Sequence, residues 1–256
     1  MKIVTCFKII YDEQEIEISS NNTLDMSKAP LMISPYDCNA IEAAVKLAES
    51  VGDSKVIALT AGGSKVENSK LKKAALSRGP AEMVAVKDEL LDSSNSYVVA
   101  LALKNAIEKI GDVDLVVCGE GSGDMYSQQT GNLIGALMGL PAINAVSSIS
   151  CESNCLVVDR SLEDCVETLK LELPAVITVS SDICTARIPS MKEILGAGKK
   201  PAVVEEISSI DAAKACKLNT ISLLAPEQTE RKQVIVKGDS DEAVQEFFEH
   251  IRKELD

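Results

Sequence analysis

The chain has 256 residues, 46% of them hydrophobic, which is enough to fill the core of one large domain or of a domain with an extension. Its formal net charge of −13, with only four Tyr, three Phe and no Trp, argues against a nucleic-acid surface, because phosphate neutralisation needs clustered Lys and Arg. No apolar run is long enough to span a membrane, and the start MKIVTCFKII lacks the apolar core of a signal peptide. We therefore expect a cytoplasmic protein without direct membrane insertion.

The cysteines and the histidine do not indicate a metal centre. The eight Cys are scattered along the chain and fit free thiols in a reducing compartment. Cys151 and Cys155 are the only close pair, and they lack a second pair or a neighbouring His. The single His250 lies in a charged C-terminal segment, which argues against a Ser-His-Asp triad or a His-based zinc site. We predict no metal site.

Strand-like and helical patterns alternate over the first half of the chain. The run KIVTCFKII indicates a buried first strand, and a polar stretch with hairpin character follows it through Ile33. The segment Ser34–Asp37 then begins a helix, for which Asp37 is the predicted N-cap. Further strands are expected at 55–60, 82–86 and 115–118, and further helices from the glycine turn 61–64 through Ser77 and at 96–110. This alternation predicts a doubly wound, mostly parallel α/β sheet with flanking helices.

A glycine-rich loop connects the strand that ends at Cys118 to the next helix. The sequence of the segment 115–141 is LVVCGEGSGDMYSQQTGNLIGALMGLP. Its glycines at 119, 121 and 123 allow the backbone N–H groups to approach a ligand closely, and the following helix start adds unpaired N–H groups and a positive dipole end. Such an arrangement most often binds phosphate.

The spacing Gly-x-Gly-x-Gly matches neither the dinucleotide fingerprint nor a P-loop. A tight turn without a ligand is therefore the alternative reading, and the polar residues Asp124 and Ser127–Thr130 favour a binding site over it. Gly131, Gly135 and Gly139 share one helix face, which predicts close packing against a sheet or a neighbouring helix.

The second half of the chain is less regular. Strands are expected at 156–159 and 166–173, and Ala175–Val179 is expected to close the sheet. The segment 180–201 looks like an exposed loop with a short helix, and 201–239 suits an extended arm. Asp241–Leu255 forms an amphipathic helix whose apolar stripe packs either on the sheet or on a partner. We thus expect an α/β nucleotide-binding domain at 1–200, and an arm and C-terminal helix at 201–256.

Several motifs resemble, in the same order, those of electron-transfer flavoprotein β subunits. They are IVTCFK, SPYDCNAIEAA, CGEGSGDMYSQQTG, VETLKLELPAV and IPSMKEILGAGKKP, and together they cover nearly the whole chain. The motifs ISPYDCNAIEAA and GDMYSQQTG look closest to those of the Fix-type anaerobic branch, which is linked to reduction of activated carnitine-like acids. The resemblance implies an electron carrier subunit without catalytic residues of its own.

The resemblance also implies cofactors and partners. A larger α subunit would form a heterodimer with this chain and hold a redox-active FAD at the interface, while this chain would bind AMP or a second FAD. The family's nucleotide contacts fall on Cys6, Ser34, Pro35, Tyr36, Asp37, Ala61, Gly119, Glu120, Gly121, Ser122, Gly123, Asp124, Met125, Tyr126, Ser127, Gln128, Gln129 and Thr130.

The segment 183–195 resembles the family's recognition loop, which anchors a flavin-dependent dehydrogenase or reductase. Ile188 matches the anchoring side chain, with Pro189 and Met191 beside it. Two other readings are open: a homodimeric nucleotide-binding regulatory protein of the stress type, and an adenylating enzyme. The chain's lack of a catalytic His, a metal cluster and a Gly-Lys-Ser/Thr motif disfavours the enzyme.

Overall fold

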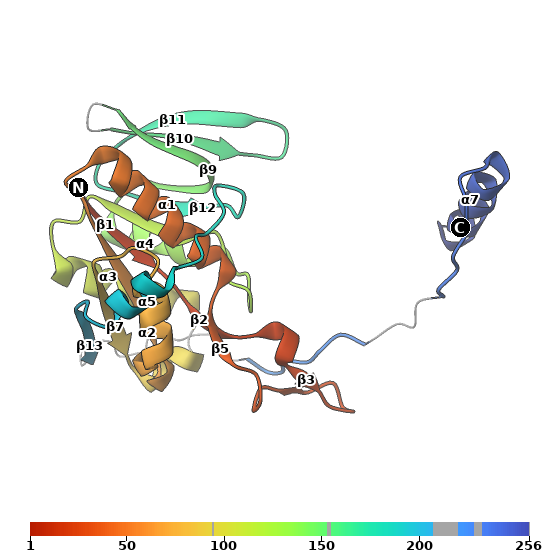
Figure 1. Cartoon of the computed structure of the whole chain (residues 1–256), viewed down its shortest axis with the longest axis horizontal. Coiled ribbons are helices and arrows are strands. Elements are labelled where there is room, and N and C mark those ends of the chain that lie inside the picture. Colours follow the sequence, from red (N-terminus) through yellow and green to blue (C-terminus); the bar gives the residue numbers. More distant parts are fainter. Residues whose placement is uncertain (94, 153–154, 207–219, 228–231, 256) are drawn as a thin grey trace.

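The computed structural model describes residues 1–93, 95–152, 155–206, 220–227 and 232–255. Its centre is one nine-stranded sheet, whose strands are spread across the view in Figure 1 from β11 to β13. In spatial order the strands are β11 (Val166–Glu172), β10 (Cys155–Ser161), β9 (Ala142–Glu152), β12 (Ala175–Val179), β8 (Leu115–Gly119), β1 (Lys2–Cys6), β6 (Lys55–Gly62), β7 (Glu82–Lys87) and β13 (Ala202–Glu206).

In spatial order, the seven strands from β9 through β12, β8, β1, β6 and β7 to β13 are parallel. Strand β10 is antiparallel to both of its neighbours, β9 and β11. The chain proceeds from β1 to β6 and β7 on one side, and then returns to place β8 on the other side of β1. The strand order therefore reverses at β1, and ligands in such sheets bind beyond the carboxyl ends of the strands at this reversal. The predicted fold class is confirmed.

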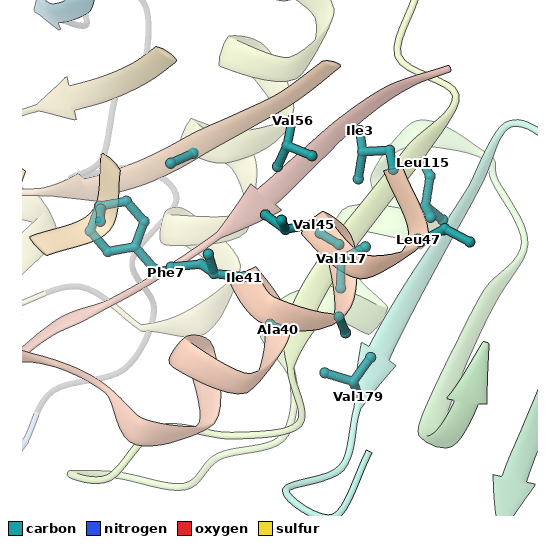
Figure 2. Packing of buried hydrophobic residues seen from close by; sticks show 14 of the residues in the cluster. Ile3, Phe7, Ala40, Ile41, Val45, Leu47, Val56, Leu115, Val117 and Val179 are labelled. Carbon is teal, nitrogen blue, oxygen red and sulfur yellow. The ribbon is translucent and has the colours of Figure 1, made fainter. Parts of the chain in front are cut away.

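Helices cover both faces of the sheet. Helix α1 (Pro35–Val51) and α2 (Ser69–Leu76) lie over one face, and α3 (Ser96–Ile110) and α4 (Thr130–Met138) lie over the other. Figure 2 shows the first face, where Ile41 and Val45 of α1 meet Ile3 and Val117 of the central strands. Full burial of a side chain such as Ile41 contributes about 1.5–3 kcal/mol. Successive side chains along a strand point to opposite faces of the sheet, so each central strand contributes residues to the core on both faces.

Two helix starts differ from the prediction. Helix α1 begins one turn earlier than expected, with Ser34 as its N-cap and Pro35 as its first residue, so the prediction of Asp37 as N-cap was wrong. Pro suits the first helical position because the N–H that it lacks would have no helical partner there. The helix expected from the glycine turn through Ser77 is split into a 3-10 helix η2 (Ser64–Glu67) and α2, because Asn68 caps α2 through the N–H groups of Lys70 and Leu71.

Three strand predictions also need correction. Strand β12 does not close the sheet but lies inside it, between β9 and β8, as its five fully buried residues require. Strand β9 was missed because its sequence is rich in small polar residues and only partly buried. The first strand breaks after Cys6, and β2 (Ile9–Tyr11) pairs with β5 (Leu31–Ile33) outside the main sheet.

A polar hairpin projects from the sheet, as expected, with β3 (Glu17–Ile18) paired to β4 (Leu24–Asp25). Later in the chain, β13 adds to the β7 edge, so the sheet extends past residue 200. Farther on, the chain returns to the hairpin, where the Ala225 N–H donates to the Asn22 carbonyl at 2.8 Å. Residues 207–219 and 228–231 of the predicted arm lie outside the described residues.

The predicted C-terminal helix is confirmed as α7 (Asp241–Leu255) and lies apart from the sheet in Figure 1. Its apolar stripe, which includes Phe247 and Phe248, is exposed, with Phe248 at 65%. The short helix α5 (Met191–Ala197) carries a capping box between Ser190 and Glu193. None of the helices in the described ranges combines the length and the apolarity needed to cross a membrane.

Helix α4 approaches the sheet more closely than a helix with side chains at every position could. Gly131 faces β12, and a methyl group built on it would lie 2.3 Å from Cγ2 of Thr178, while one built on Gly135 would lie 2.5 Å from Cβ of Ala142. Gly139 plays a different role from the one predicted, because it ends the helix in the left-handed conformation with open space around it.

We predict that Gly131→Ala lowers the free energy of unfolding by about 1–3 kcal/mol, because α4 must move away from β12. The matched control is Gly196→Ala in α5, where nothing lies within 4 Å of the added methyl group. That change should leave stability unaltered or raise it by about 1 kcal/mol. Urea denaturation followed by circular dichroism measures both, and equal effects of the two substitutions would contradict the packing argument.

Candidate functional site

The candidate site lies where β1 and β8 end side by side at the reversal of strand order. Cys6 ends β1 and is buried, and Cys118 lies beside it on β8, also buried. A hydrogen bond between the two thiols, together with burial, raises the pKa of Cys6 well above its usual value. Both side chains belong to the core that packs against α3 and α4, and Cys6 is a poor nucleophile because the thiolate is the reactive form.

Asp37 ties the start of α1 to the ends of both strands. It is 6% exposed, and its Oδ2 accepts the backbone N–H of Lys8 at 2.7 Å. A methyl group on Gly119 would lie 2.7 Å from Oδ1 of Asp37, so only glycine permits this approach. Burial raises the pKa of Asp37 to about 7, although hydrogen bonds from the backbone of Lys8 and Gly119 act in the opposite direction.

Lys8 also holds the glycine-rich loop. Its Nζ donates to both carboxylate oxygens of Asp124, at 2.6 and 2.8 Å, and the Ser122 hydroxyl donates to the same carboxylate. Although burial favours the neutral acid, these hydrogen bonds hold the pKa of Asp124 below its usual value, so the carboxylate is ionised. The loop is thus fixed by a charged contact that joins the end of β1 to the segment after β8.

Aromatic packing and unusual backbone angles shape the rest of the loop. The ring of Tyr126 lies over Gly121, where an added methyl group would come within 2.4 Å of it, and its centroid is 5.1 Å from that of Tyr36. Tyr126 and Gln128 both have positive φ, at 44° and 55°. Non-glycine residues in this region cost about 1–3 kcal/mol each, and such strain is concentrated at binding and catalytic sites.

A cavity of about 520 Å³ opens between the starts of α3 and α4. Helix α3 contributes Asn95, its N-cap, with Ser96 and Tyr97, and α4 contributes residues of its first two turns. The side chain of Gln129, the N-cap of α4, makes no capping hydrogen bond. Two helix N-termini thus border one cavity, and their N–H groups and dipoles favour an anion there. The remaining lining residues are Gln128, Gln129, Asn132, Leu133 and Ala136.

The predicted contact residues lie mainly along one edge of the sheet. Cys6, Ser34–Asp37 and the loop Gly119–Thr130 meet at the ends of β1 and β8. Ala61 lies one strand away, near the end of β6, where the Gly63 N–H donates to Asp92 at 2.9 Å. Sequence reasoning missed Lys8, Asn95, Ser96, Tyr97 and Asn132; an N-cap signal at Asn95 was available, whereas nothing local marked Lys8.

This edge fits an anionic nucleotide. The hydroxyl of Ser34 is buried and has no hydrogen-bond partner among the described residues, so it is available to a ligand. The α3 and α4 N-termini suit a phosphate, and the cavity volume lies within the range of small-molecule sites. The candidate partner residues lie elsewhere, on the segment 183–195 that is predicted to be a recognition loop: Ile188 and Met191 are exposed there, and Pro189 is half-buried between them.

We predict a pH dependence from Asp37. Because burial raises the pKa of Asp37 from its ordinary value of 3.8 to about 7 in the fold, the unfolded chain binds fewer protons between those values, and stability falls as pH rises from about 4 to 7. The loss amounts to at most roughly 4 kcal/mol. Asp37→Asn should remove it, so the difference in unfolding free energy between variant and wild type should shift in favour of the variant over this range. Parallel curves for the two proteins would refute the burial effect.

A comparison with protein-family models adds an independent finding. Residues 22–210 match the electron transfer flavoprotein domain. The match spans 189 of the 256 residues and includes α1, β6 to β13 and the glycine-rich loop. The chain belongs to the electron transfer flavoprotein family.

Proposed function

We propose that this chain is the small, β-type subunit of a heterodimeric electron-transfer flavoprotein that passes electrons between a dehydrogenase and an acceptor. The observation that carries the proposal is the family match over a chain whose strand reversal, glycine-rich loop and helix N-termini lie together around a candidate nucleotide site. Because its motifs resemble those of the Fix-type branch, we infer a role in anaerobic metabolism of acyl-CoA or carnitine-type acids.

The nucleotide held by this subunit is AMP or a second FAD. Its phosphate would lie at the starts of α3 and α4, where backbone N–H groups and helix dipoles stabilise negative charge. The unpartnered Ser34 hydroxyl and the backbone at Gly119 would contact other polar groups of the nucleotide. Lys8 would hold the glycine-rich loop in position, because its Nζ donates to Asp124 and its backbone N–H donates to Asp37.

The redox-active FAD would bind at the interface with the larger α subunit. When bound, it supplies the one-electron chemistry, and the protein supplies binding, orientation and electrostatics. This chain's own part is to form one wall of that interface and to exclude water from it. The acidic surface, with a net charge of −13, contributes a field that favours some redox partners over others.

Helix α7 would dock on the α subunit. Its stripe of Val244, Phe247, Phe248 and Ile251 is exposed on a helix that is otherwise charged. Burial of such a stripe in a groove is a common mode of helix recognition, and each large side chain contributes about 1.5–3 kcal/mol when it leaves water. Ile188, Pro189 and Met191 on the recognition loop would contact the partner dehydrogenase instead.

The test of the proposed function is co-expression with candidate α subunits, followed by denaturing release and chromatographic identification of the nucleotides. We expect a one-to-one heterodimer that holds one FAD and one further nucleotide, either AMP or FAD. Expressed alone, the chain should associate with itself, because Phe247, Phe248 and Ile251 lack cover. A stable, monodisperse monomer on expression alone, or a chain that stays without an α subunit in co-expression and carries ATP or no nucleotide, would overturn the proposal.

We further predict that Gln129→Glu lowers occupancy of the nucleotide site in this subunit at least about tenfold, because the added charge repels a phosphate at the α3 and α4 N-termini. The substitution is compatible with the fold, since an acidic side chain stabilises a helix N-terminus. Gln14→Glu, at an exposed position in the 3-10 helix η1 (Glu13–Glu15), is the matched control and should keep full occupancy. Equal occupancy in both variants would place the phosphate elsewhere.

A further inference from the structure

The recognition loop (183–195) presents exposed apolar side chains. Ile188 is 95% exposed, Met191 72% and Leu195 71%, so little of the described chain covers them. Side chains on an unrestrained loop sample many conformations, and ordering them on contact with a partner costs free energy. The contacts that hold the loop on either side of Ile188 therefore influence how strongly it binds.

Arg187, directly before Ile188, joins the loop to α1 through a forked ion pair with Glu42. Its Nε donates to Oε2 of Glu42 at 2.7 Å, its Nη2 donates to Oε1 at 3.2 Å, and its backbone N–H donates to Oε2 at 3.2 Å. Its Nη1 also donates to Oε1 of Glu49, which lies two helical turns after Glu42 on α1, at 3.2 Å. The ion pair thus fixes both the backbone and the side chain of the residue next to Ile188.

Glu42 depends on Arg187 for its charge. It is only 3% exposed, and its second cation, Lys46, lies farther away at 3.8 Å. Burial acts to raise the pKa of Glu42, but the hydrogen bonds from Arg187 outweigh it and hold the pKa below its usual value. An ionised carboxylate at such a position needs a close partner, because burial of an uncompensated charge is costly. Helix α1 therefore favours one position of Arg187.

Further contacts hold the ends of this region. Before the loop, Nδ2 of Asn39 on α1 donates to the Ser181 carbonyl at 2.7 Å. After α5, Nζ of Lys200 donates to the carbonyls of Leu76 and Pro80 at the end of α2, at 2.8 and 2.6 Å. The exposed apolar residues thus lie between anchored points, and Arg187 is the anchor next to Ile188.

We propose that Arg187 is a positioning residue for partner docking, whose fork with Glu42 holds Ile188 in the conformation that the partner dehydrogenase binds. The inference rests on the proposed role of the recognition loop. It adds that the Arg187–Glu42 ion pair sets the affinity of this loop for the partner dehydrogenase. A docking side chain that is ordered before contact needs no ordering during contact, which improves affinity without adding any new interaction to the interface.

The test uses the double substitution Glu42→Met/Arg187→Met in the heterodimer. A single substitution would leave the other charge buried and unpaired, whereas replacement of both members by apolar side chains is often neutral for stability. The control is Lys55→Met/Glu82→Met, which removes another ion pair, at 2.8 Å, with no change in net charge. This pair joins the amino ends of β6 and β7, where it cannot contact the recognition loop.

The probe is a purified acyl-CoA dehydrogenase supplied with excess acyl-CoA, which is oxidised and provides the electrons, and the readout is the rate at which the reduced dehydrogenase reduces the heterodimer's flavin at increasing heterodimer concentration. We expect the double variant to raise the KM for the heterodimer at least about tenfold, with kcat, FAD content and melting temperature unchanged. Hydrogen exchange of the amides at 183–195 should become faster. The control variant should keep the wild-type KM and exchange.

The outcomes separate this inference from the proposed function. If the double variant shows faster hydrogen exchange of the amides at 183–195 while its KM stays within about twofold of wild type, the positioning role of Arg187 is overturned. If Ile188→Ala also leaves KM unchanged, or if the FAD-loaded wild type accepts no electrons from the dehydrogenase, the docking surface itself is wrong and the inference falls with it. Should the double variant lose stability, Arg187→Lys, which keeps the charge without the fork, must still raise KM at wild-type stability for the proposal to hold.

Discussion

Helix α1 packs Ile41, Ala44 and Val45 against the central strands, and both functional regions are built on the position that this packing gives it. At its start, Asp37 reaches the ends of β1 and β8 and sets the path of the glycine-rich loop. Along its outer side, Glu42 and Glu49 hold the base of the recognition loop. A shift of α1 relative to the sheet would therefore move the proposed nucleotide site and the proposed partner-binding surface together.

The two buried acidic residues of α1, Asp37 and Glu42, differ in what offsets the cost of their burial. Asp37 receives backbone N–H groups and no full counter-charge, so its pKa rises towards neutrality. Glu42 receives a guanidinium and stays ionised at a pKa below its usual value. Neither arrangement contributes much net stability, because hydrogen bonds and ion pairs mainly offset the cost of desolvation. Their effect is geometric: each carboxyl group has few positions in which its bonding capacity is satisfied, and those positions fix neighbouring segments.

The sequence predicts the parallel sheet well because buried strands and amphipathic helices leave clear periodic patterns. Elements without such a pattern are the ones that were missed or misplaced: β9 mixes small polar residues with half-buried ones, and β12 shows a buried run whose neighbours in space no local pattern reveals. The glycine-rich loop was located from its residues alone. Lys8 was not, because its role depends on contacts with Asp37 and Asp124, which are 29 and 116 residues away in the chain.

The return of the chain to the N-terminal hairpin, where Ala225 bonds to Asn22, has a consequence for the C-terminal helix. Between Ala225 and the first residue of α7, Asp241, the backbone can reach roughly 55 Å at most. The first residue of α7 must therefore lie within that distance of Ala225, which limits the surfaces on which the helix can dock. Once the proposed second subunit binds the main body, the length of the connecting segment, and not the protein concentration in solution, sets the effective concentration of α7 near that subunit. The contact of the main body and the contact of α7 then combine into one strong attachment, even if each is modest.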